Sequence, residues 1–156
     1  MFTSQFHVYL GAESETGFAG FISEERFSCI LDCESGLEHD RGREILKKLA
    51  FLVNEKLPNT LAELENIVTS EIKEYNIPLS FSLALCFRTT DGRLLIHTDN
   101  IGVIYIKRSG QTAKVITGTK GATGYIEDND FVFLTTQKLV SHFHDEHEFI
   151  SLLNRG

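Results

Sequence analysis

The order of the predicted elements indicates an α+β fold, and three features of the sequence support it. Short apolar and aromatic segments alternate with polar residues in the first third of the chain, as in antiparallel strands. Two amphipathic helical segments follow, and a second run of strand-like segments comes after them. Strands therefore occur in runs, without the strand–helix–strand alternation that a parallel sheet requires. With 156 residues and no internal repeat, the chain is expected to form a single domain over residues 1–156.

Three strands are predicted before the first helix, and each is rich in aromatic or β-branched residues. They are QFHVYLG (5–11), GFAGFIS (17–23) and RFSCILDC (26–33). Polar residues and glycine separate them, and the pair Glu24 and Glu25 predicts a tight hairpin between the last two. We expect these segments to pair as antiparallel strands.

Two helices are predicted at residues 40–56 and 60–75, since apolar residues recur at helical spacing in both. Pro58 marks the end of the first helix. Thr60 suits the cap of the second, and Glu63, three residues later, completes a capping box. The apolar stripe of each helix is typical of core packing, so we expect both helices to cover one face of a sheet.

A second run of strands is predicted after Pro78. Its members are LSFSLALCFR (79–88), LLIHT (94–98), GVIYIKR (102–108), TAKVIT (112–117) and DFVFLT (130–135), with helical turns closing the chain. The glycines of GTKGATGYIEDN (118–129) predict a loop before the last of these strands. The side chains expected in the core by their phase in strands and helices are Phe27, Ile30, Leu49, Leu64, Ile67, Leu83, Leu85, Ile104, Ile106, Phe131 and Phe133.

The composition argues against several classes of partner and location. A net charge of −7 disfavours nucleic acid or an anionic membrane as a partner, because both need a basic face. No apolar run approaches the roughly 20 residues of a transmembrane helix, and MFTSQFHVYL lacks the pattern of a signal peptide. Three cysteines without a CxxC pair argue against a zinc ribbon or a disulfide framework. We therefore expect a soluble cytoplasmic protein.

Four segments carry patterns that belong together. FSCILDCESG is a strand that ends in an aspartate and a turn, and PLSFSLALCF is a strand that follows two helices. IHTDNIGVIYIKRSG is a hairpin around a strand with a basic end, and DFVFLTTQKLVSHFHDEHEFI is a strand that enters a helix with an acidic start. In this order, and over nearly the whole chain, they resemble the metal-dependent protein phosphatase family, the protein phosphatase 2C-like enzymes. The short loop before DFVFL resembles the compact bacterial branch of that family.

The resemblance implies both a fold and a chemistry. The fold is two stacked antiparallel sheets flanked by helices, with the active site at one end of the sandwich. The family hydrolyses phosphoserine and phosphothreonine with two Mg²⁺ or Mn²⁺ ions, which activate a water molecule and offset the charge of the phosphoryl oxygens. Such hard cations need several oxygen ligands, chiefly carboxylates at strand ends.

Few of the family's carboxylates have a counterpart in this sequence. Asp32 matches the aspartate of Asp-Gly, with Cys33 in place of the glycine, although a turn cap is an equally good interpretation of Asp32. Gln137 and Lys138 stand where the family has the aspartate and glycine of Thr-Asp-Gly. A carboxamide does not replace the charge of a carboxylate, and a lysine adds a positive charge beside the metal position.

The middle motif is altered as well. The family's Gly-Asp-Ser-Arg matches Asn100, Ile101, Gly102 and Val103, so its acid is absent here. Asp99, which lies just before this segment, is the weaker alternative as a metal ligand. Only one carboxylate thus remains in register with the family's motifs.

The remaining ligand positions lie toward the two ends of the sequence. The family's arginine followed by Asn-Glu-Asp has no counterpart, since residues 11–20 offer only Glu13 and Glu15. The family closes with a strand that opens on Asp-Asn, and the sequence reaches Gly156 before such a strand. What fills the place of that strand is left open, and the predicted N-terminal strand QFHVYLG is one candidate within the monomer. An uncovered strand edge would favour a homodimer or another protein partner.

Two polar clusters are interpreted as structural. His144 and His147 lie three residues apart, a spacing that metal sites use, yet HDEHEF falls where a helix begins. Asp145 suits the cap position, and the acids after it suit the first turn, because the helix dipole favours negative charge there. His97 and Asp99 lie two residues apart on one strand face and are interpreted as an exposed polar pair.

Three functions are consistent with these observations. The first is a pseudophosphatase, a protein phosphatase 2C-like domain without its metal centre that needs no cofactor and binds a protein partner. The second is an active Mg²⁺- or Mn²⁺-dependent phosphatase whose site is rebuilt from Asp32, Asp99, Glu13 or Glu15. The third is an unrelated structural α+β domain. The missing acids favour the first over the second, and the ordered segments favour the first over the third.

Overall fold

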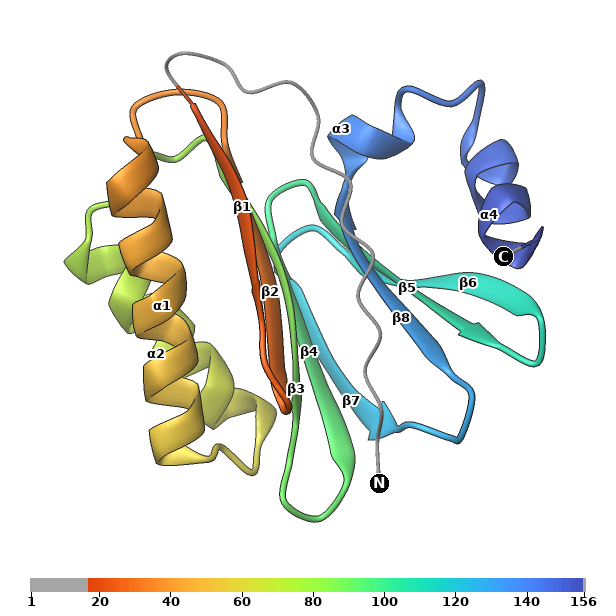
Figure 1. Ribbon diagram of the computed structural model, residues 1–156, viewed down its shortest axis with the longest axis horizontal. Coiled ribbons are helices and arrows are strands. Elements are labelled where there is room, and N and C mark those ends of the chain that lie inside the picture. Colours follow the sequence, from red (N-terminus) through yellow and green to blue (C-terminus); the bar gives the residue numbers. More distant parts are fainter. Residues whose placement is uncertain (1–16, 156) are drawn as a thin grey trace.

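The computed structural model describes residues 17–155, which form two antiparallel sheets packed face to face with helices on the outside (Figure 1). The strands are β1 (Phe18–Ser23), β2 (Phe27–Cys33), β3 (Phe81–Arg88), β4 (Arg93–Asp99), β5 (Gly102–Arg108), β6 (Gln111–Thr117), β7 (Lys120–Tyr125) and β8 (Phe131–Thr136). The helices are α1 (His39–Lys56), α2 (Leu61–Glu74), α3 (Gln137–Val140) and α4 (Glu146–Arg155). The predicted α+β class and the stacked sheets are confirmed, and the strand predicted at 5–11 lies outside the described residues.

The two sheets differ in size. The larger sheet has the strand order β1-β2-β3-β4-β7, and the smaller one has the order β6-β5-β8. All neighbouring strands are antiparallel, and the predicted hairpin is confirmed by the Glu24 N–H, which donates to the Phe27 carbonyl at 2.8 Å. Helices α1 and α2 cover the outer face of the larger sheet, while α3 and α4 lie on the side of the smaller sheet (Figure 1).

Both predicted helices are confirmed, and local hydrogen bonds define their ends. At the end of α1, the left-handed backbone of Leu57 (φ 46°) lets its N–H donate to the Val53 carbonyl at 3.0 Å. At the start of α2, Thr60 Oγ1 accepts from the Glu63 N–H at 3.2 Å, as predicted. The Glu63 carboxylate accepts from the Asn59 N–H at 2.7 Å instead of from the cap residue, so the reciprocal half of the capping box is shifted by one residue.

The predicted core is confirmed except at one position. Of the predicted side chains, those that are buried are Phe27, Leu49, Leu64, Ile67, Leu83, Leu85 and Ile104, and those that are half-buried are Ile30, Ile106 and Phe133. The expectation for Phe131 is wrong, because this side chain is 54% exposed. Phe131 opens the edge strand β8 opposite Lys107. Apolar alternation predicts the face to which a side chain points, but not whether a neighbouring layer reaches the end of that strand.

The loop predicted at residues 118–129 is wrong over its middle part. Residues Lys120–Tyr125 form β7, which pairs with β4 at the edge of the larger sheet. A Cβ added at Gly121 would lie 2.4 Å from Glu65 Oε1 and 2.8 Å from the Leu61 side chain, both on α2. Gly121 therefore permits a close approach of helix to strand, whereas Gly118, with a φ of 78°, is a turn glycine.

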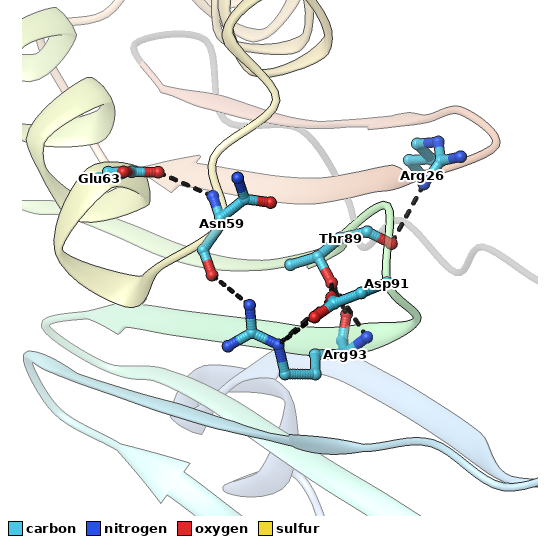
Figure 2. Close-up of polar contacts among 6 residues, drawn as sticks. All are labelled: Arg26, Asn59, Glu63, Thr89, Asp91 and Arg93. Carbon is cyan, nitrogen blue, oxygen red and sulfur yellow. Dashed lines mark hydrogen bonds and ion pairs between the residues drawn. The ribbon is translucent and has the colours of Figure 1, made fainter.

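Polar contacts join the hairpin ends of the larger sheet to the connection between α1 and α2 (Figure 2). Arg26 Nη1 donates to the Thr89 carbonyl at 3.1 Å, and Thr89 Oγ1 donates to the Asp91 carboxylate. Arg93 binds Asp91 through Nε at 3.0 Å and donates from Nη2 to the Asn59 carbonyl at 2.7 Å. These contacts stabilise one end of the sheet, and the predicted site residues lie at the opposite end.

Candidate functional site

The matched segments meet at one end of the sandwich, as the resemblance implied. Asp32 lies at the end of β2, Ile101 in the turn from β4 to β5, and Gln137 and Lys138 at the junction of β8 with α3. The Gln137 N–H donates to the Ile101 carbonyl at 2.8 Å, which fixes the turn against the junction. Strand β8 contacts β2, and the positive charge of Lys138 acts on the Asp32 carboxyl, so the junction also lies close to β2. We call this region the site end.

Asp32 is half-buried and points between the sheets, because it lies two residues after Ile30 on β2 and so shares the face that packs on the inner core. Burial raises the pKa of its carboxyl, the positive charge of Lys138 opposes that rise, and the charge of Glu34 adds to it. The net effect is a pKa above the usual value. Glu34 was not among the predicted site residues, since it lies in an exposed turn two residues after Asp32.

The middle motif positions serve the backbone of the turn. Asn100 has a left-handed backbone (φ 54°), and its side-chain amide donates to the carbonyls of Phe81 and, at 3.3 Å, Leu79. A Cβ added at Gly102 would lie 2.0 Å from the Leu83 carbonyl oxygen. Ile101 is 44% exposed and contributes its carbonyl to the junction. These residues position the turn and carry no acid.

The carboxylates of Asp99 and Asp32 do not lie at the same site. Asp99 pairs with Leu83 on β3, whereas Asp32 pairs with the preceding residue, Ser82. Because successive residues of a strand point to opposite faces, the two carboxylates lie on opposite sides of the larger sheet. One ion cannot be shared between them.

The interpretation of His97 and Asp99 as an exposed pair is wrong, because they are only 6% and 8% exposed. His97 Nε2 lies 2.9 Å from Asp99 Oδ2, and His97 Nδ1 lies 3.4 Å from Glu65 Oε1 on α2. Burial lowers the pKa of His97, but the hydrogen bond and charge of Asp99, together with Glu65, outweigh burial and raise it. A carboxylate beside each ring nitrogen favours the doubly protonated imidazolium, which links α2 to the sheet.

The histidine-rich segment is a helix start, as interpreted. Asp145 Oδ1 accepts from the Glu148 N–H at 2.8 Å, and the His144 N–H donates to Glu148 Oε2 at 2.7 Å. This pair is a capping box for α4 whose reciprocal half is shifted by one residue, as at α2. Within residues 17–155, no group of three or more His, Cys, Asp or Glu side chains is arranged to hold a metal ion. Glu13 and Glu15 lie outside the described residues.

Gln137 has one notable polar atom. Its Oε1 is buried and has no hydrogen-bond partner within the described part of the chain. A buried carbonyl without a partner costs about 1–3 kcal/mol. The junction therefore holds an unsatisfied acceptor one residue before Lys138.

Neither a family model nor a curated protein sequence matches the chain. Two bacterial phosphatase structures are among the solved structures that share its fold. The serine/threonine phosphatase PstP/Ppp of Mycobacterium tuberculosis has a TM-score of 0.64 and 11% identity, over 87% of this chain and 78% of that chain. The PP2C phosphatase domain with a regulatory fragment of SpoIIE from Bacillus subtilis has a TM-score of 0.51 and 13% identity, over 93% of this chain and 47% of that chain.

The topology and these two structural matches agree with each other. Residues 17–155 contain no helix with the length and apolar composition that crossing a membrane requires. At identities of 11% and 13%, these matches show a shared architecture only. The chemistry must be inferred from the residues of this chain. The chain has the protein phosphatase 2C-like fold.

Proposed function

We propose that this chain is a pseudophosphatase, a domain with the protein phosphatase 2C-like fold that binds a protein partner and does not hydrolyse phosphate esters. The observation that carries the proposal is the junction of β8 with α3. By the resemblance of the sequence, Gln137 and Lys138 match the aspartate and glycine of the family there. Gln137 is neutral, and the positive charge of Lys138 acts on Asp32 across the site end.

The described residues at the site end do not fit a pair of divalent cations. Two Mg²⁺ or Mn²⁺ ions need several ionised oxygen ligands. Asp32 and Glu34 are the acids whose charges interact here. Lys138 adds a charge that repels a cation. Asp99 faces the other side of the sheet and is bonded to His97. We therefore assign no metal to this site.

Without a metal centre, the function that we propose for this fold is to bind a partner. A domain can present the surface of its fold to a protein without the ligands of the related chemistry. A protein partner is favoured because the net charge of −7 disfavours nucleic acid and anionic membranes. The three cysteines are free, which suits a reducing compartment. We propose a cytoplasmic binding or regulatory module.

The proposal is tested by titrating the full chain with Mn²⁺ in a calorimeter and by assaying p-nitrophenyl phosphate and phosphopeptides with Mn²⁺ or Mg²⁺. We expect neither metal binding nor turnover. The matched variant combines Gln137→Asp with Lys138→Gly and restores the family's residues at the junction. It exchanges a repulsive charge for an attractive one, so we expect it to bind Mn²⁺ about tenfold or more tightly than the wild type.

One result would reverse this assignment. Mn²⁺-dependent turnover by the wild type that disappears in Asp32→Ala would identify an active phosphatase. The acids that complete such a site would then come from Glu13 or Glu15, and their replacement by glutamine would abolish turnover as well.

A further inference from the structure

Helix α4 lies on the outer side of the smaller sheet, where it belongs to a small apolar cluster (Figure 1). Of the side chains of Glu146–Arg155, only Phe149 is buried. The Phe149 ring packs against the rings of Tyr105 on β5 and of Phe143, with centroids 5.2 Å and 5.1 Å apart. The two larger clusters, between the sheets and beneath α1 and α2, contain no α4 side chain among the described residues. Separation of α4 from the sheet would therefore leave both of them packed.

Two lysines of the sheet hold the ends of α4. Lys107 on β5 donates from Nζ to the carbonyls of Leu153 at 3.0 Å and Asn154 at 3.4 Å, at the C-terminal end of the helix, where the dipole favours a cation. Lys114 on β6 binds Glu146 at the other end, with Nζ 2.8 Å from Oε2. Lys107 is only 8% exposed, so its ammonium group loses most of its hydration while α4 is in place. These contacts fix where α4 binds, at a cost in desolvation.

Polar atoms without a hydrogen-bond partner lie in the same layer. Thr112 is opposite Lys107 in the strand register and so points to the same face of the sheet, the face that α4 covers. Thr112 Oγ1 and Asn154 Oδ1 are buried and have no partner within the described part of the chain. Such atoms cost free energy while they are buried and gain hydrogen bonds from water once they are exposed. They therefore oppose the binding of α4 to the sheet.

The Tyr105 hydroxyl is buried beside α4 too, but its surroundings are mixed. It makes no hydrogen bond of normal geometry with the described residues. Burial, together with the charge of Glu146 and a hydrogen bond toward it, nevertheless raises the pKa of Tyr105 to about 12. Because Glu146 lies near this hydroxyl, removing the hydroxyl would change two interactions at once. Thr112 is the cleaner position at which to measure the effect of an unpaired group.

We propose that α4 is a reversible cover of the smaller sheet, which opens and closes as a unit while the two larger clusters stay packed. The N–H of Phe143 donates to the Val140 carbonyl of α3 at 3.1 Å, whereas the N–H of His144 donates to Glu148 of α4 at 2.7 Å. The chain can therefore bend between Phe143 and His144 without breaking either of these hydrogen bonds. Opening uncovers an aromatic ring, a hydroxyl and an ammonium group on the outer face of β5 and β6, so α4 controls access to that face.

Hydrogen exchange of the full chain, followed by mass spectrometry at urea concentrations below the unfolding transition, tests the proposal. An isolated helix of ten residues is marginal in water, so the α4 amides exchange whenever the helix opens. The amides of Leu83–Leu85 in the buried strand β3 report global unfolding. We expect the α4 amides to exchange about a hundredfold or more faster than these, with a weaker dependence on urea because opening exposes less surface.

Three variants separate the contributions to α4 binding. Thr112→Val removes the unpaired hydroxyl and keeps the shape of the side chain, so we expect exchange of the α4 amides to slow by about fivefold or more. Thr123→Val makes the same change at an exposed position on β7, in the other sheet, and should leave α4 exchange unchanged. Phe149→Ala removes the central contact, so we expect α4 to lose its protection while the β3 amides stay about a hundredfold or more slower than those of α4.

Three results would overturn the proposal. Equal exchange rates and equal urea dependence for α4 and β3 in the wild type would mean that α4 opens only when the whole chain unfolds. Exchange of α4 in Thr112→Val that is no slower than in Thr123→Val would mean that the buried hydroxyl does not oppose the binding of α4. A fall of β3 protection to the level of α4 in Phe149→Ala would mean that the larger clusters depend on this helix.

Discussion

Replacing Gly102 with alanine is expected to be among the most damaging single-methyl changes in the protein. The added Cβ would lie 2.0 Å from the Leu83 carbonyl oxygen, 2.9 Å from the Leu83 carbonyl carbon and 3.2 Å from the Asp99 carbonyl oxygen. Contacts under 3.0 Å are not tolerated, so β3 and the β4–β5 turn must separate by roughly 1 Å. Neither neighbour is a flexible side chain. We expect a loss of about 3 kcal/mol or more, the upper range for overpacking.

Urea unfolding followed by circular dichroism measures this loss. With an m-value of about 1–3 kcal/mol/M, a loss of 3 kcal/mol lowers the midpoint by roughly 1–3 M. Gly124→Ala is the matched control, because nothing lies within 4 Å of its added Cβ, and it should stay within about 1 kcal/mol of the wild type. Gly121→Ala meets side-chain atoms of Glu65 and Leu61, which can move, and should fall between the two. A Gly102→Ala variant as stable as Gly124→Ala would refute the close packing of the turn on β3.

Three further outcomes follow from buried groups. The pKa of His97 is raised above 6.5 in the folded state, so its stabilising contribution is complete below pH 6.5 and is lost as pH rises through the folded value. We expect His97→Gln to remove this pH dependence, measured as the free energy of unfolding from pH 5 to pH 9. The pKa of Asp32 is raised above 3.8, so ionisation destabilises the fold as pH rises through that range. Asp32→Asn should therefore be more stable than the wild type at pH 7 and equal to it near pH 3, and a lower stability at pH 7 would contradict the burial of this carboxyl. Leu49→Ala, at a fully buried position between α1 and the sheet, should cost about 2–5 kcal/mol in the same unfolding assay.

Local sequence signals predicted the helices and most strands, because each depends on neighbours in the chain. The helical spacing of apolar residues and the cap at Thr60 are examples. These local signals failed where an element distant in the sequence determines the environment of a residue. Gly121 was interpreted as part of a loop, but α2 lies against it. His97 was interpreted as exposed, but Glu65, far away in sequence, completes its surroundings. Only the position of α2 on the sheet explains both.

The candidate site was also predicted only in part, and for the same reason. The order of the matched segments predicted that Asp32 and the Gln137–Lys138 pair would meet at one end of the sandwich. It did not predict the relation of Asp32 to Asp99, because strand register decides which face each carboxylate occupies. A sequence comparison treats neighbouring acids as interchangeable candidates. In a sheet, a difference of one register position places them on opposite sides.

Backbone contacts, and not charges, hold the site end together. The Gln137 N–H bonds to the Ile101 carbonyl at 2.8 Å, Asn100 bonds to backbone carbonyls, and Gly102 lies against the backbone of Leu83. None of these contacts needs an acidic side chain or a cation. The fold can therefore bring the strand ends together whether or not they carry metal ligands, because the same turn and junction form with a neutral glutamine at position 137. For this reason, likeness of fold to a phosphatase is weak evidence for its chemistry, and the side chains at the junction carry the functional assignment.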